Sequence, residues 1–309
     1  MTKSRLLYDA NDRLRTIWRV LAFIAFTIVS FVVSVNVLVL LYGDPRNDVL
    51  GLVLYQWTVV AALVLAHLVT LRTIDKRSWS DLGLGSEQAR PRYALLGIVV
   101  GMLAIALPMA LMYALSWLRI RPAPDGSSVD FALIMLALFI PAAFHEELAF
   151  RGYIFRVLRE SWGWVGAAVV TSVVFAAFHS FNPNGCYTTW RAGSFDLQTC
   201  AQSMLLVTLA GIFLAAVLIY TGSLYAAWAA HFAWNWMMTG VLHAPVSGQA
   251  EIVPGVTMPD FLMVENGPDV VTGGPWGPEG GLLAALSMVV AMLLLRRYAR
   301  HVHPEEPRR

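Results

Sequence analysis

The chain has 309 residues, of which 58% are hydrophobic and only 14% are charged, and this composition excludes an ordinary soluble globular domain. The formal net charge of +2 is too small to indicate a nucleic-acid-binding protein, so no nucleic-acid partner is expected. The composition predicts an all-α membrane protein that crosses the bilayer several times.

A helix needs about 20 apolar residues to cross the hydrocarbon core of a bilayer. The first apolar run is long enough to span and lacks a small-residue cleavage site, so no cleavable signal peptide is expected. The sequence predicts eight spans in a single transmembrane domain that covers residues 1–309. In chain order these runs are Ile17 to Leu41, Leu50 to Leu71, Tyr93 to Leu118, Phe131 to about Phe155, Trp164 to Phe181, Ser203 to Tyr220, Ser223 to Leu242, and Leu282 to Tyr298.

The distribution of basic residues predicts the orientation, because lysines and arginines collect in cytoplasmic loops. Eighteen of the 22 basic residues fall on one side of an eight-span arrangement, and only Arg46, Arg119, Arg121 and Arg191 fall on the other. Both termini are therefore predicted to be cytoplasmic, in a plasma or inner membrane. The loop at residues 243–280 would then be extracytoplasmic, and its many glycines and prolines predict that it is partly disordered.

Cys186 and Cys200 are the only cysteines, and both lie in the loop between the fifth and sixth predicted spans. This loop is expected to face an oxidising compartment, which favours a disulfide between them. Two free thiols remain the alternative, and two cysteines alone are too few for a zinc site.

Glu146 and Glu147 are the only two of the 20 acidic residues that fall within a predicted span. A charged side chain at the centre of a bilayer costs on the order of 3 kcal/mol by insertion scales, so such a pair indicates a function or a neutralising partner. Arg151 lies four residues after Glu147, on the same helical face, and is expected to neutralise it. Glu146 points about a quarter-turn away and is left for another role.

Two further spans each carry a pair of candidate residues with a spacing of four. These are Phe175 with His179, and His231 with Asn235. Together with Glu146 they would supply a carboxylate, two imidazoles and an amide from three helices to one intramembrane cavity.

This set of side chains suits hydrolysis, and two designs remain open. In one, Glu146 is the general base for a water molecule, His179 shares that water, and His231 and Asn235 stabilise the oxyanion. In the other, Glu146, His179 and His231 bind a zinc ion that activates the water. The first design is slightly favoured, because an asparagine is a poor zinc ligand but a good oxyanion donor.

Neighbouring residues are interpreted as structural. His145 and Glu146 begin a His-Glu-x-x-His pattern, but Ala149 occupies the fifth position, so the helical zinc signature lacks a ligand. His67 is expected to make a core or inter-helix contact, and Phe175 is expected to pack.

The ordered motifs Glu146-Glu147-x-x-x-Arg151, Phe175-x-x-x-His179 and His231-x-x-x-Asn235 resemble those of the CAAX-protease and bacteriocin-processing family of intramembrane proteases. The resemblance covers roughly residues 131–242, which would form the catalytic core. It implies a helical fold with an internal cavity. Glu146, His179, His231 and Asn235 would form the catalytic site, with His231 and Asn235 as oxyanion or metal-binding groups, and Glu147 and Arg151 would support it.

The predicted function is therefore that of an intramembrane endopeptidase acting on a membrane-associated protein or peptide, with no required cofactor slightly favoured over zinc. A proton-coupled transporter is the alternative from another class, since intramembrane carboxylates and histidines also relay protons. A catalytically silent immunity or scaffold protein of the same fold is a third possibility.

Overall fold

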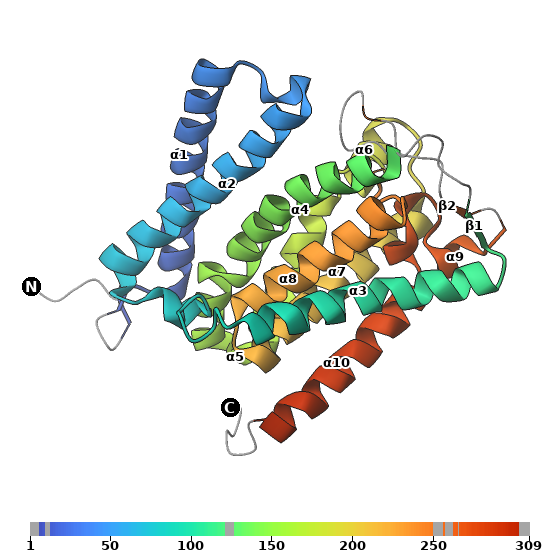
Figure 1. The fold of residues 1–309 in the computed structure, drawn as a ribbon. Coiled ribbons are helices and arrows are strands. Elements are labelled where there is room, and N and C mark those ends of the chain that lie inside the picture. The colour runs from blue at the N-terminus through green and yellow to red at the C-terminus, as the bar shows by residue number, and fades with distance from the viewer. Residues whose placement is uncertain are drawn as a thin grey trace, which may run out of the picture.

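The structure is a computed structural model, and it describes residues 6–9, 13–120, 127–249, 256, 262–264 and 266–302. These residues fold into a helical bundle with one small two-stranded sheet at its edge (Figure 1). The α-helices are α1 (Thr16–Tyr42), α2 (Val49–Thr70), α3 (Pro91–Ala114), α4 (Ser127–Arg151), α5 (Tyr153–His179), α6 (Cys186–Arg191), α7 (Leu197–Thr221), α8 (Leu224–Asn235), α9 (Asp269–Thr272) and α10 (Leu282–Val302).

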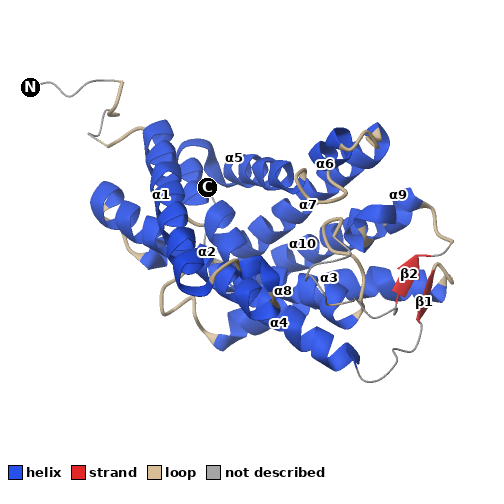
Figure 2. Ribbon diagram, turned by 90° about the horizontal axis from the view of Figure 1, so that it is seen from above, coloured by secondary structure: helices blue, strands red, loops and turns tan. Residues whose placement is uncertain are grey.

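Shorter elements complete the bundle. Two π-helices extend longer helices: η2 (Leu71–Asp75) follows α2, and η4 (Trp236–Val241) follows α8. The 3-10 helices are η1 (Pro45–Asn47), η3 (Trp79–Leu82), η5 (Gly274–Trp276) and η6 (Pro278–Gly280). Strands β1 (Leu118–Ile120) and β2 (Leu262–Val264) pair antiparallel, with Leu118 opposite Val264, at one end of the molecule (Figure 2).

The all-α membrane fold is confirmed, and each of the eight predicted apolar runs contains a helix. Six described helical segments are long and apolar enough to cross a membrane. One of them, Ser128–His179, has 52 residues because α4 and α5 are separated only by Gly152. The number of eight crossings therefore stays a prediction.

The predicted boundary between the fourth and fifth spans is wrong. The fourth span is predicted to run to about Phe155, but α4 ends at Arg151 and Tyr153 begins α5. A second break lies inside α5 at Gly163, whose φ of 69° belongs to the left-handed region that favours glycine. The chain thus changes direction at both glycines, and His179 ends α5.

Helix α8 packs closely against other helices, and five of its 12 residues are alanines. Ala226, Ala227 and Ala230 are fully buried, which lets neighbouring backbones approach closely. On the facing side, α3 presents Gly97 and Gly101, where an added Cβ would lie 2.2 Å and 2.1 Å from the carbonyl oxygens of α8. Only glycine fits at these two positions, and this contact fixes the position of the helix that carries His231.

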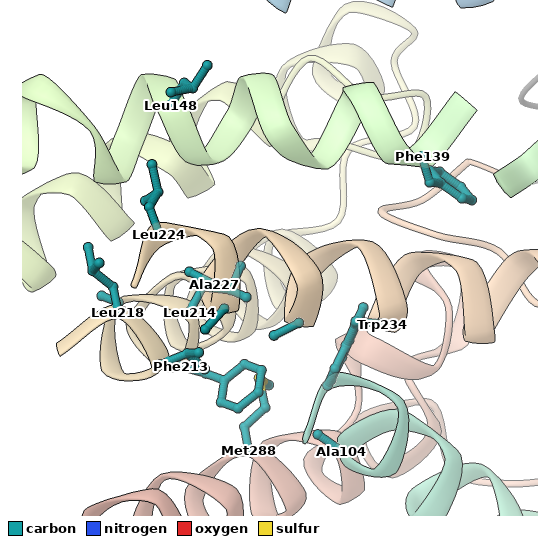
Figure 3. Close-up of a cluster of buried hydrophobic side chains, with 14 of the residues drawn as sticks. Ala104, Phe139, Leu148, Phe213, Leu214, Leu218, Leu224, Ala227, Trp234 and Met288 are labelled. Atoms are coloured by element: carbon teal, nitrogen blue, oxygen red, sulfur yellow. The ribbon is translucent and has the colours of Figure 1, made fainter. Parts of the chain in front are cut away.

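Larger apolar side chains fill the remaining space around α8. Leu148 of α4, Phe213 and Leu214 of α7, Trp234 of α8 and Met288 of α10 belong to one cluster of buried apolar side chains (Figure 3). The hairpin of α1 and α2 lies at one side of this core (Figure 1).

The loop predicted to span residues 243–280 lies partly outside the described residues, at 250–255, 257–261 and 265. Its described parts include α9, η5 and η6. Asn182 and Asn184, just after α5, donate hydrogen bonds to the carbonyl oxygens of Ser247 and Gly248 at 2.9 Å and 2.8 Å. The turn at Ser247 is thereby joined to the end of α5 that carries His179.

Candidate functional site

The two adjacent glutamates of α4 differ in their environments. The Glu147 side chain is fully buried, and its Oε1 accepts a hydrogen bond of 2.9 Å from Nη1 of Arg151. The Glu146 side chain is 28% exposed and lines a cavity. Because successive residues on a helix point in different directions, one carboxylate is neutralised inside the bundle while the other can meet a ligand.

Arg151 makes contacts with three helices. Besides its ion pair with Glu147, its Nη2 donates a 2.9 Å hydrogen bond to the carbonyl oxygen of Gly211 in α7. Its guanidinium carbon lies 4.6 Å from the centre of the Phe175 ring in α5. A buried arginine needs such partners because an unpaired charge is costly in a low-dielectric interior.

His231 connects α8 to both glutamates. Its Nδ1 donates a 2.8 Å hydrogen bond to Oε1 of Glu147, which fixes the orientation of the ring. Its other nitrogen, Nε2, then lies 3.7 Å from Oε2 of Glu146. That separation is too long for a direct hydrogen bond, so Nε2 of His231 lies near the Glu146 carboxylate without bonding to it.

His179 is oriented in a similar way by its own helix. Its Nδ1 donates a 2.8 Å hydrogen bond to the carbonyl oxygen of Phe175, and the two rings lie 4.4 Å apart. The hydrogen bond leaves Nε2 available to a ligand. His179 also lies within electrostatic reach of Glu146, and Asn235 lines the same cavity one helical turn after His231.

A cavity with a volume of about 1550 Å³ is lined by all four predicted catalytic residues. Its apolar walls come mainly from α1, α2, α4 and α5. This volume greatly exceeds that of one amino-acid side chain, so the space can hold an extended segment of a larger molecule. Residues at its wall include Glu146, His179, His231, Asn235, Gln56, Val59, Phe139, Phe150 and Phe178.

The residues interpreted as structural have clear partners. The His67 side chain is fully buried, and its Nε2 accepts a 3.1 Å hydrogen bond from the backbone N–H of Tyr153, so the predicted inter-helix contact is confirmed. Phe175 packs against Phe150, Arg151 and His179, as expected of a packing residue.

Several polar groups near the site were not identified from the sequence. Gln56 of α2 lies 2.8 Å from Nε2 of His145 through its Oε1, and both residues line the cavity. Ser247 also lines the cavity, and Glu279 contacts Ser247 from a distant loop. These residues have no regular spacing from the motif residues, so the motifs do not point to them. The one sequence signal for Gln56 is that it is a polar residue within an apolar helix.

Cys186 and Cys200 form a disulfide, which joins the start of α6 to the first turn of α7. It fixes the segment that follows His179.

The donor types of Glu146, His179 and His231 suit a zinc ion, since two imidazoles and a carboxylate are a common zinc set. The distances between these three side chains do not suit a common metal ion. Among the residues that the structure describes, no group of three His, Cys, Asp or Glu side chains lies close enough to hold a metal ion.

A comparison with known protein families agrees with the three motifs. Residues 128–237 match the family described as type II CAAX prenyl endopeptidase Rce1-like. Over these residues, the chain is similar to the Rce1-like family, and residues 128–237 are called the Rce1-like segment below. The predicted family resemblance is confirmed, because this match is to a family of prenyl endopeptidases.

The Rce1-like segment extends from the start of α4 into η4 and contains all seven residues of the three motifs. It excludes α1, α2, α3 and α10. No curated protein and no solved structure matches the chain.

Proposed function

We propose that this protein is an intramembrane endopeptidase that hydrolyses a peptide bond of a membrane-associated protein or peptide. One observation carries the proposal. Glu146 is an accessible carboxylate at the wall of a large apolar cavity, and the neighbouring Glu147 is already neutralised by Arg151. Glu146 is thus the one glutamate of the pair able to take a proton from water.

In the proposed reaction a water molecule on the cavity side bridges the carboxylate of Glu146 and Nε2 of His231, whose nearest atoms lie 3.7 Å apart. Glu146 removes a proton from this water as its oxygen attacks the carbonyl carbon of the substrate. His179 helps to hold the water, and Asn235 donates a hydrogen bond to the oxyanion that forms. When the C–N bond breaks, the proton passes from Glu146 to the departing amine nitrogen.

The supporting residues keep this arrangement fixed before substrate binds. Glu147 holds the Nδ1 side of His231, and Arg151 holds Glu147. Catalytic groups that are oriented in advance need no reorganisation during the reaction. We further propose a plasma or inner membrane location with both termini cytoplasmic, on the basis of the arginine and lysine distribution.

The test compares the wild-type protein with Glu146→Gln, which keeps the size of the side chain but removes the base. Purified proteins are reconstituted in proteoliposomes with a library of fluorescently labelled, membrane-anchored peptides, in prenylated and unprenylated forms. We expect the wild type to cleave members of the library and Glu146→Gln to lose cleavage, with unchanged thermal unfolding. Glu87→Gln is the matched control, because the side chain of Glu87 is 73% exposed, and it should retain full activity.

Undiminished cleavage by Glu146→Gln would refute the proposed mechanism. A proton flux that depends on Glu146, without any cleavage, would instead establish the transporter alternative. If wild type and variant bind a membrane peptide equally and neither cuts it nor conducts protons, the protein is a silent scaffold.

A further inference from the structure

Glu279 is a buried carboxylate outside the Rce1-like segment. It lies in η6 and is 8% exposed. Its Oε2 accepts a 2.9 Å hydrogen bond from Nε1 of Trp234, and its Oε1 accepts hydrogen bonds from the backbone N–H and the hydroxyl of Ser247, at 2.6 Å and 2.9 Å. All three donors are neutral groups on elements that form the candidate site.

The Trp234 contact lies at the point where α8 changes its hydrogen-bonding pattern. Asn235 is the last residue of α8, and the π-helix η4 begins at Trp236. π-Helical turns are rare and often occur at functional sites. We infer that contacts with residues outside the helix help to set the direction of side chains next to such a turn. The hydrogen bond from Trp234 to Glu279 supplies such a contact directly before Asn235.

The contact between Glu279 and Ser247 fixes a turn that lines the large cavity. Ser247 lines the large cavity and has a φ of 50°, a left-handed conformation that is unfavourable for a residue with a side chain. Its backbone N–H and hydroxyl are both held by Glu279, and its carbonyl oxygen is held by Asn182. Glu279 thus joins the end of α8 to the strained turn that faces it.

A small hollow confirms that these groups are neighbours of the site. It has a volume of about 30 Å³, which is the space of roughly one water molecule. The polar residues around it are His179, His231, Asn235, Ser247 and Glu279. The carboxylate therefore shares a hollow with the catalytic groups, and the other residues around it, apart from Ser247, come from α5, α7 and α8.

We propose that Glu279 is a positioning residue of the active site. Acting through Trp234 and Ser247, it fixes the direction of Asn235 and the position of the cavity wall that faces it. This inference rests on the proposed endopeptidase function, because it assigns a role in the orientation of Asn235 toward the substrate carbonyl.

Glu279→Gln tests this role with a minimal change of shape. The amide oxygen can still accept from Ser247, but the amide N–H groups then face the N–H of Trp234, and two donors cannot bond to each other. We expect kcat to fall by about 10- to 100-fold, because small displacements of catalytic groups cost this much. KM is expected to change little, since the apolar walls that hold the peptide are untouched.

Trp234→Phe in the same chain is the rescue variant, because it removes the opposing donor. The double variant Glu279→Gln with Trp234→Phe should be more active than Glu279→Gln alone. In an Asn235→Ala background, where the positioned group is absent, Glu279→Gln should leave the remaining kcat unchanged. All rates are measured with the membrane-anchored peptide library in proteoliposomes, and thermal unfolding is followed in parallel.

Unchanged kcat in Glu279→Gln, while Glu146→Gln is inactive, would overturn the inference and leave the proposed function standing. An equal loss of kcat in the wild-type and Asn235→Ala backgrounds would also overturn it, since the carboxylate would then act independently of Asn235. Cleavage by Glu146→Gln would instead remove the proposed function. If Glu279→Gln does not fold, Trp234→Phe alone takes its place, with the expected loss of kcat in the wild-type background and none in Asn235→Ala.

Discussion

The ion pair of Glu147 and Arg151 offers a direct test of how the bundle is stabilised. Both side chains are fully buried, and Arg151 also bonds the carbonyl oxygen of Gly211. Arg151→Met keeps most of the apolar volume but leaves the carboxylate of Glu147 without its cation. Removing one partner of a buried ion pair typically costs about 3–5 kcal/mol, and we expect a loss of this size in the free energy of unfolding.

The measurement is unfolding in mixed micelles, titrated with sodium dodecyl sulfate and followed by circular dichroism. Arg46→Met is the matched control, since Arg46 makes a 2.8 Å ion pair with Asp44 but its side chain is 80% exposed. Exposed ion pairs contribute little to stability, so Arg46→Met is expected to cause no measurable change in the free energy of unfolding. The double variant Glu147→Gln with Arg151→Met should regain at least about 1 kcal/mol relative to Arg151→Met, because no buried charge is left unpaired. Equal stability of Arg151→Met and Arg46→Met would refute this account.

Three further outcomes are expected. Gly101→Val should destabilise the protein by about 1–3 kcal/mol in the same titration, because its Cβ would overlap the backbone of α8, whereas Leu107→Val, on the exposed face of α3, should have a much smaller effect. Reduction of the disulfide between Cys186 and Cys200 should lower stability by about 3 kcal/mol, the chain-entropy value for a separation of 14 residues, and the double serine variant should not respond to reductant. Peptide cleavage should survive removal of metal ions by chelators, and a loss that zinc restores would show that the metal-independent mechanism is wrong.

The local features of the site follow from helix geometry and could be predicted from the sequence. A spacing of four residues places Glu147 beside Arg151 and Phe175 beside His179, whatever the rest of the fold does. The same reasoning pairs Arg151 with Glu147 and leaves Glu146 free, but it could not show that the Glu147 ion pair is fully buried while Glu146 lines a cavity. That difference depends on Gly211 and the other groups that surround Arg151, and these come from distant parts of the chain.

The connection between the fourth and fifth helices illustrates the limits of hydropathy. Hydropathy favoured a long fourth helix, because apolar residues continue past Arg151, but the chain breaks at Gly152. An added Cβ at Gly152 would lie 2.4 Å from Nε2 of His67, so the glycine is required by a contact with α2. A contact with a helix 80 or more residues earlier leaves no sign in the local pattern.

The sequence by itself determined that this chain is a bundle of membrane helices with a few expensive polar groups, because a hydrocarbon environment requires long apolar helices and penalises each charge. It also determined the family motifs, since their spacing is a property of single helices. Tertiary packing alone decided that Nδ1 of His231 bonds Glu147 while Nε2 faces Glu146, and that Glu279 reaches the site from a separate loop. These contacts join segments far apart in the chain, and their geometry depends on how closely the helices pack.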